Sequence, residues 1–233
     1  MKFDPPLRRA TLLKRYKRFL ADVRFEDGTE LTAHCANPGS MLGLAEPGST
    51  VWLSKSNNPK RKLAWSLELV DVSSYLVGVH TGRPNALVEA AIKAGELPEL
   101  EGYETVRREV KYGENSRIDL LLEDPARPAA YVEVKSVTLS RKKGLAEFPD
   151  SKTARGAKHM AELAEMAKQG HRAVVFFLVQ RSDCMSMQPA TDIDPKYAES
   201  LTTALAAGVE VLCYSCRLSP DEITLDRRLE VAI

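Results

Sequence analysis

Apolar and polar residues alternate over short segments in the first eighty residues, and turn signals interrupt this alternation. The turns are Asp27-Gly28, Asn37-Pro38-Gly39 and Pro47-Gly48, which contain the residue types that favour tight changes of chain direction. We predict strands at residues 19–24, 30–34, 51–54, 64–72 and 75–79. Strands of this number and length would close a small β-barrel.

The pattern changes at Pro84, because a proline suits the first turn of a helix and strong helix formers follow it. We expect helices at residues 84–92, 153–168 and 195–207, and strands at 105–111, 117–122, 131–137, 172–180 and 209–214. Alternating strands and helices indicate a mixed α/β sheet. The sequence therefore predicts two domains, a barrel over residues 1–80 and an α/β domain over 81–233.

Length and composition favour a cytoplasmic globular protein without membrane contact. With 233 residues, of which 44% are hydrophobic, the chain can bury a substantial core. The longest apolar stretch, residues 173–179, is too short to span a bilayer, and the basic N-terminus lacks the apolar core of a signal peptide. Four cysteines are too few for a disulfide framework, and the Cys213-x-x-Cys216 pair has no second pair or histidine at zinc spacing.

The small net charge conceals an asymmetry. Residues 1–65 contain 12 Lys and Arg against 6 Asp and Glu, whereas the remainder contains 21 against 26. Basic residues interleaved with aromatic ones are typical of barrels that bind single-stranded nucleic acid. The candidates are Arg8, Arg9, Arg15, Tyr16 and Arg18. A solvated basic face is the alternative, and Phe19, Trp52 and Trp65 can instead fill the core, which we favour for the tryptophans.

The strands predicted at 117–122 and 131–137 carry the residues best suited to chemistry. Glu133 and Lys135 are two residues apart, so their side chains leave the same face of the strand. The spacing to Asp119 fits a hairpin, which would bring two carboxylates and an ammonium group together. Two carboxylates can hold magnesium or manganese, and such an ion can activate a water for phosphodiester cleavage. An isolated Glu-x-Lys pair would otherwise be an ordinary solvent-facing pair.

Five motifs in order resemble the sugar fermentation stimulation protein A (SfsA) family. They are Asn37-Pro38-Gly39-Ser40-Met41, Ser116-Arg117-Ile118-Asp119, Glu133-Val134-Lys135-Ser136-Val137-Thr138, Phe148-Pro149-Asp150 and Thr153-Ala154-Arg155-Gly156-Ala157-Lys158-His159. The resemblance implies an α/β (α+β) chain with an N-terminal OB-like barrel and a C-terminal PD-(D/E)xK nuclease-like mixed sheet flanked by helices. It also implies DNA binding without clear sequence preference. The family takes its name from an effect on sugar metabolism.

The PD-(D/E)xK resemblance assigns roles to individual residues. Asp119 and Glu133 match the metal carboxylates, and Lys135 matches the catalytic lysine. Glu89 matches by position an acidic residue that the core often adds from a preceding helix, although a lone glutamate on a helix is more often solvated. Gln180 matches a polar residue that some nucleases of this core place near the site, and a polar strand terminus is the alternative.

A second basic stretch lies beside this constellation. Thr153 or Ser151 could cap the following helix, whose positive N-terminal end would favour a phosphate. The nucleic-acid-binding candidates of this stretch are Arg141, Lys142, Arg155, Lys158 and His159. His159 lies on the same helix face as Arg155, although a single helix histidine is more often a structural hydrogen-bonding residue.

Two functions follow, a metal-dependent nuclease acting on DNA and a DNA-binding regulator that keeps the nuclease fold without cutting. The presence of all three residues, Asp119, Glu133 and Lys135, favours the nuclease. The DNA could be single-stranded or branched. A barrel also permits RNA, and a homodimer is compatible with nucleases that cut two strands.

Overall fold

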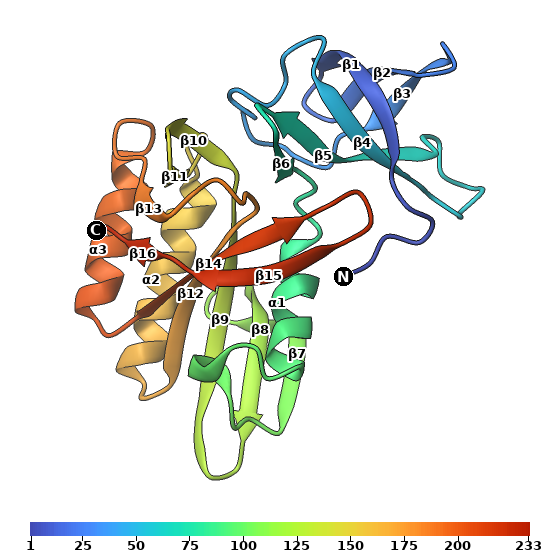
Figure 1. Cartoon of the computed structure of the whole chain (residues 1–233). Helices are drawn as coiled ribbons and strands as arrows, with labels where there is room; N and C mark the ends of the chain where they lie inside the picture. The colour runs from blue at the N-terminus through green and yellow to red at the C-terminus, as the bar shows by residue number, and fades with distance from the viewer.

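A computed structural model describes all residues from Met1 to Ile233, and the chain forms two bodies joined at residues 79–83. The barrel lies at one end of the molecule and the α/β domain at the other, with strands β10 and β11 turned toward the barrel (Figure 1). None of the helices has both the length and the apolar character needed to cross a bilayer.

The N-terminal body is a closed OB barrel, as predicted. Its strands are β1 (Arg8–Tyr16), β2 (Leu20–Phe25), β3 (Glu30–His34), β4 (Thr50–Lys55) and β5 (Trp65–Val72), followed by β6 (Tyr75–Gly78). The strand order is β3-β2-β1-β4-β5-β6, and a parallel pairing of His34 with Ser66 joins β3 to β5 and closes the barrel. The interior is apolar and includes fully buried Leu12, Val23 and Leu53.

The structure corrects the identity of one barrel strand. We expected residues 75–79 to complete the barrel, but within the barrel β6 pairs only with β5, and Val77 of β6 bridges to Arg181 of the second body. The barrel position between β2 and β4 is filled by β1. The register of β1 against β2 shifts between Leu12 and Lys14. This bulge breaks the two-residue alternation, and the many basic residues of β1 hide the remainder of the pattern.

The second body contains the expected mixed sheet, which we call the main sheet, with strand order β15-β14-β12-β9-β8-β7. These strands are β7 (Thr105–Tyr112), β8 (Ser116–Asp124), β9 (Arg127–Val137), β12 (Arg172–Val179), β14 (Glu210–Leu218) and β15 (Ile223–Arg228). The helices α1 (Pro84–Lys93), α2 (Ala154–Lys168) and α3 (Pro195–Ala206) match the predicted ones closely, and η1 (Pro98–Leu100) is a short 3-10 turn. A smaller sheet, which the sequence did not indicate, contains β10 (Leu139–Lys142), β11 (Leu145–Phe148), β13 (Ser186–Pro189) and β16 (Glu230–Val231).

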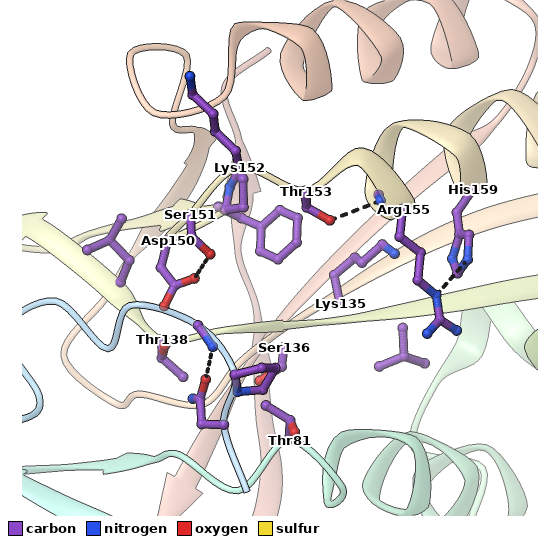
Figure 2. Close-up of a pocket in the computed structure, with 18 of the residues that line it drawn as sticks. Thr81, Lys135, Ser136, Thr138, Asp150, Ser151, Lys152, Thr153, Arg155 and His159 are labelled. Atoms are coloured by element: carbon purple, nitrogen blue, oxygen red, sulfur yellow. Dashed lines mark hydrogen bonds between the residues drawn. The ribbon is translucent and has the colours of Figure 1, made fainter. Parts of the chain in front are cut away.

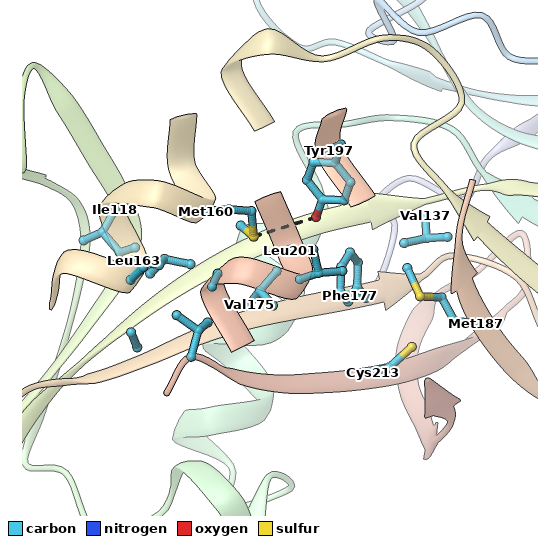
Figure 3. Packing of buried hydrophobic residues seen from close by; sticks show 14 of the residues in the cluster. Ile118, Val137, Met160, Leu163, Val175, Phe177, Met187, Tyr197, Leu201 and Cys213 are labelled. Atoms are coloured by element: carbon cyan, nitrogen blue, oxygen red, sulfur yellow. Dashed lines mark hydrogen bonds between the residues drawn. The ribbon is translucent and has the colours of Figure 1, made fainter. Parts of the chain in front are cut away.

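The central strand β12 is buried on both faces, which explains its continuous apolar sequence. Phe177 faces the cluster formed with α2 and α3, where Met160, Leu201 and Tyr197 pack around it (Figure 3). Phe176 faces the opposite cluster, which is covered by α1 and the first residues of the chain. This packing fixes β9, the neighbour of β12, between two apolar layers.

The first seven residues pack on the second body, although the predicted division at residue 80 would assign them to the barrel. Lys2 forms a bridge with Glu222, and the backbone of Phe3 and Leu7 donates to the turn before β15. The side chains of Phe3 and Leu7 join the apolar cluster under α1. The N-terminal segment therefore ties the barrel to the sheet.

A second connection joins the loop 37–41 of the barrel to Asp150. Met41 N donates to Asp150 Oδ2 at 3.0 Å, and Ser40 Oγ donates to the Asp150 carbonyl at 2.7 Å. Gly39 lies so close that a Cβ on it would be 2.5 Å from an Asp150 carboxylate oxygen. Glycine at this position therefore allows the two bodies to meet, and we call this contact the loop–Asp150 clasp.

Gly39→Ala should destabilise the protein by about 1–3 kcal/mol, because the added methyl group would push the loop away from Asp150. Chemical denaturation of Gly39→Ala, Asp150→Ala and the double variant would measure this cost. Most of the cost of Gly39→Ala should vanish in the Asp150→Ala background, since the obstructing carboxylate is then absent. Equal costs in both backgrounds would contradict the steric explanation.

Candidate active site

The antiparallel pairing of β8 with β9 brings Asp119 beside Glu133. Leu120 pairs with Val132, so Asp119 and Glu133 are the next facing residues and project from the same side of the sheet. Val134 N donates to Asp119 Oδ2 at 2.8 Å, and Asn85 Nδ2 from α1 donates to Asp119 Oδ1 at 2.8 Å. These two bonds fix the orientation of the Asp119 carboxylate.

Glu133 is almost completely buried and receives two donors on one oxygen. Lys135 Nζ donates to Glu133 Oε1 at 2.8 Å, and His159 Nδ1 from α2 contacts the same oxygen. Arg155 Nε donates to His159 Nε2 at 3.2 Å. His159 therefore links Glu133 and Arg155 through its two ring nitrogens.

The two carboxylates have opposite pKa shifts. Burial and the nearby charge of Glu133 raise the pKa of Asp119 from 3.8 to about 6. Burial would also raise the pKa of Glu133, but the His159 hydrogen bond and the Lys135 ammonium group outweigh it and hold that pKa below its ordinary value. The site therefore carries one firmly ionised carboxylate and one whose ionisation is disfavoured.

The donor set fits a hard divalent cation. Glu133 Oε2 is buried and has no hydrogen-bond partner in the chain. Each Asp119 oxygen accepts a single hydrogen bond, which leaves a lone pair for a ligand. Glu89, the third ligand suggested by position, instead pairs with Lys93 at 2.6 Å and Arg108 at 3.7 Å. His159 lies beside the carboxylates, but its Nδ1 contacts Glu133, and no set of three metal-binding side chains forms.

The N-terminus of α2 is directed at the same site. Thr153 caps the helix by accepting from Gly156 N at 3.0 Å, as one of the two predicted capping residues. Asp194, the cap of α3, accepts from Thr153 N at 2.7 Å and thereby holds the start of α2 in place. Arg155, in the first turn of α2, uses its Nε for His159, while its terminal nitrogens have no partner in the chain and remain available for a phosphate.

These groups line a cavity of about 460 Å³ between the two bodies, which we call the cleft. Asp119, Glu133 and Lys135 belong to its sheet side, and Figure 2 shows Lys135 near Arg155 and His159, with Thr81 across from them. The barrel contributes Arg18 and residues 37–39. The cleft is therefore composite, and neither body forms it alone.

The basic and aromatic residues of the barrel that were predicted to bind nucleic acid have different positions and partners in the structure. Arg18 reaches the cleft, where its Nε donates to the Pro38 carbonyl at 3.0 Å. Arg15 is a structural residue, because its guanidinium donates to the backbone carbonyls of Asn37, Gly39, Ser40 and Arg18. The remaining candidates are outside the cleft and lie in local contacts: Arg8 with Asp27, Arg9 with Glu26, and Tyr16 with Asp22.

The basic stretch of the second body is divided in the same way. Arg155 and His159 line the cleft, but Arg141 does not, because its guanidinium is occupied by Glu147 and Asp192. This ion pair replaces the phosphate contact expected for Arg141. Lys158 Nζ donates to the Glu114 carbonyl at 2.6 Å, and Lys142 is exposed on β10 away from the cleft.

Two polar contacts support the site; the sequence suggested Gln180 but gave no signal for Asn85. Asn85 orients Asp119, yet it follows a helix-opening proline like any early helix residue. Gln180 donates to Ser136 Oγ at 2.8 Å, and Ser136 lines the cleft, so Gln180 holds the Ser136 side chain in position. In the loop 37–41, the Gly39 amide donates to Asn37 and the Met41 amide to Asp150, so these two amides shape the cleft and are not free to bind a phosphate.

In metal-free protein, Asp119→Asn should raise stability at pH 8 by about 1–2 kcal/mol, because it removes a charge that burial and Glu133 disfavour. The raised pKa means that the bound proton stabilises the fold below the ordinary pKa of 3.8, and this contribution is lost as the pH rises through about 6. Thermal denaturation in EDTA should therefore show the gain at pH 8 and almost none near pH 4. Asp221→Asn, in an exposed turn, is the control, and a gain independent of pH would contradict this explanation.

Comparison with known proteins agrees with this architecture. The family model described as "SfsA N-terminal OB domain" matches residues 13–79, and the one described as "Sugar fermentation stimulation protein RE domain" matches residues 82–222. A sugar fermentation stimulation protein homolog of Rhodospirillum centenum is 60% identical over 232 residues and covers 100% of both chains. One of Paramagnetospirillum magneticum is 60% identical over 225 residues, which cover 97% of this chain and 95% of that protein.

A solved structure shares the whole fold. The structure of Pyrococcus furiosus SfsA in complex with Ca2+ superimposes with a TM-score of 0.91 at 30% sequence identity, over 100% of this chain and 98% of that one. Its match spans both the barrel and the mixed sheet. The family models together with these relatives show that the chain belongs to the sugar fermentation stimulation protein A (SfsA) family.

Proposed function

We propose that this protein is a divalent-metal-dependent nuclease that cleaves phosphodiester bonds in DNA. The observation that carries the proposal is the pair Asp119 and Glu133, with Lys135 beside them, in a cleft that the barrel completes. A protein that only bound DNA would have no evident use for a buried carboxylate with an unpartnered oxygen.

Asp119 and Glu133 would hold the metal, which we expect to be magnesium or manganese. Their oxygens are the ligands that these ions prefer, and a bound cation would offset the burial and the Glu133 charge that raise the pKa of Asp119. When bound, such an ion lowers the pKa of a coordinated water and neutralises charge on a phosphate oxygen. The Ca2+ named in the description of the Pyrococcus furiosus structure is consistent with a divalent cation.

The remaining side chains would bind and orient the phosphate. Lys135 is only slightly exposed, and its ammonium group lies at the carboxylate pair, where it can stabilise negative charge on the phosphate. Arg155 offers its two terminal nitrogens to a phosphate oxygen, in the fork geometry that arginine provides. The Glu133–His159–Arg155 chain of hydrogen bonds holds that guanidinium beside the carboxylates.

DNA is the substrate that the surroundings of the site favour. The residues from Arg8 to Arg18 include six cations and no acidic residue, and Arg18 borders the cleft directly. Arg8 and Arg9 pair with acidic residues and Arg15 binds backbone carbonyls. Lys14, Lys17 and Arg18 therefore carry most of the charge that is available to attract a phosphate backbone. The OB barrel, a fold used widely for nucleic-acid binding, is positioned to guide a strand to the carboxylates.

Lys135→Ala should lower metal-dependent cleavage by at least about 100-fold, because the phosphate loses its nearest ammonium group. Labelled single-stranded, duplex and branched DNA would be incubated with Mg²⁺, Mn²⁺ or EDTA. Lys168→Ala, which removes an exposed cation at the far end of α2, is the control and should cleave like the wild type. DNA binding of equal strength by wild type and Lys135→Ala, with no cleavage under any condition, would refute the nuclease and leave a DNA-binding regulator on this scaffold.

His159→Asn should weaken DNA binding by loosening Arg155. The asparagine amide can still donate to Glu133, but its shorter side chain places no acceptor at the position of His159 Nε2, where Arg155 Nε donates. Affinity for a labelled oligonucleotide would be measured for His159→Asn, Arg155→Ala and the double variant. We expect the double variant to bind no more weakly than Arg155→Ala, since His159 acts through that residue, whereas additive losses would give His159 an independent role.

A further inference from the structure

The hairpin between β1 and β2 carries an exposed aromatic ring next to the cleft. Phe19 is 46% exposed, although a phenylalanine in a barrel normally points into the core. Its ring stacks on His34 of β3, with centroids 6.5 Å apart and an interplanar angle of 16°. Its chain neighbour Arg18 lines the cleft. The stacked rings of Phe19 and His34 are therefore next to a residue that lines the candidate active site.

The strand register extends this aromatic surface across the outside of the barrel. Tyr16 pairs with Leu20, and Leu20 pairs with His34, so these three side chains form one row on the outer face. The ring of Tyr16 is held in place by its hydroxyl, which donates to Asp22 at 3.2 Å. We call Phe19, Tyr16 and His34, together with Leu20 between the last two, the aromatic row.

The charges around the aromatic row match a phosphate backbone. Lys17 and Arg18, at the hairpin tip, have φ angles of 47° and 63°, a left-handed conformation that is costly for residues other than glycine. Lys14 Nζ lies 5.6 Å from the centre of the Tyr16 ring. The hairpin thus presents cations beside flat rings, which is the combination that binds single-stranded nucleic acid.

We infer that the aromatic row is a base-stacking platform for an unpaired DNA strand, which leads that strand past Arg18 into the cleft. In a duplex, both faces of each base are covered by neighbouring bases, so Phe19 can stack only on a base that is unpaired and exposed. The substrate of the proposed nuclease is therefore single-stranded DNA or DNA with a single-stranded segment beside the cut. This inference rests on the proposed function for the strand's cleavage but not for its binding.

The test is to measure binding by the full chain in EDTA, so that cleavage cannot interfere. The probes are a labelled oligothymidylate, a duplex of the same length, and an oligodeoxynucleotide containing 2-aminopurine, whose fluorescence reports base stacking. Phe19→Ala should weaken binding of the oligothymidylate by about 5- to 100-fold and abolish the 2-aminopurine response, with little effect on the duplex. Phe19→Trp should retain both signals.

Tyr75→Ala is the matched control, because Tyr75 is also an aromatic residue of a barrel hairpin, is equally exposed at 46%, and has no neighbour in the cleft. It should bind every probe like the wild type. Unchanged binding by Phe19→Ala, or an equal loss for single strand and duplex, would overturn the platform. Tighter binding of oligouridylate than of oligothymidylate, lost in Phe19→Ala, would overturn DNA as its occupant.

The two proposals can fail separately. If the wild type cleaves no DNA with Mn²⁺ but Phe19→Ala shows the selective loss, the platform stands and the nuclease is refuted. If the wild type cleaves DNA and Phe19→Ala binds all probes normally, the platform is refuted and the nuclease stands.

Discussion

A charged carboxylate buried beside a β-sheet is costly unless cations or hydrogen-bond donors compensate its charge, and Glu133 imposes this constraint on its neighbourhood. Lys135 comes from the same strand, whereas His159 must be brought from α2, so the helix has to pack on that face of the sheet. The packing of Met160 and Leu163 from α2 into the apolar cluster holds it there. One oxygen of Glu133 still has no hydrogen-bond partner, and a divalent cation bound there would compensate its charge.

The second constraint is that the cleft needs both bodies. The loop–Asp150 clasp and the packing of the first seven residues on β15 fix the barrel against the sheet. Arg83, at the start of α1, adds an ion pair with buried Glu68 of β5, with Nε and Oε2 3.0 Å apart. Because several separate contacts join the bodies, the basic hairpin of the barrel has a defined position relative to the carboxylates. For the proposed nuclease, one body would then hold a substrate strand while the phosphate lies at the other.

Sequence patterns were most informative where the periodicity was strong. The three long helices and five of the six strands of the main sheet have regular apolar spacing, and their predicted bounds differ from the observed ones by only a few residues, whereas β15 was not predicted. The strand β1 was missed because a bulge breaks its alternation, and β10, β11, β13 and β16 were missed because strands of two to four residues contain too little pattern. The basic residues were the hardest to assign, since Arg15, Arg18, Arg141 and Arg155 look alike in a sequence.

The sequence by itself determined the two-domain plan and the shared face of Glu133 and Lys135, because both follow from local periodicity along one strand. It also placed Asp119 opposite Glu133, since a short hairpin allows few registers. Only the tertiary structure decided which cations face the cleft, that Asn85 orients Asp119, and that Phe19 lies outside the barrel beside His34. Those facts depend on contacts between residues far apart in the chain, and no local pattern encodes which partners will meet when the two bodies pack together.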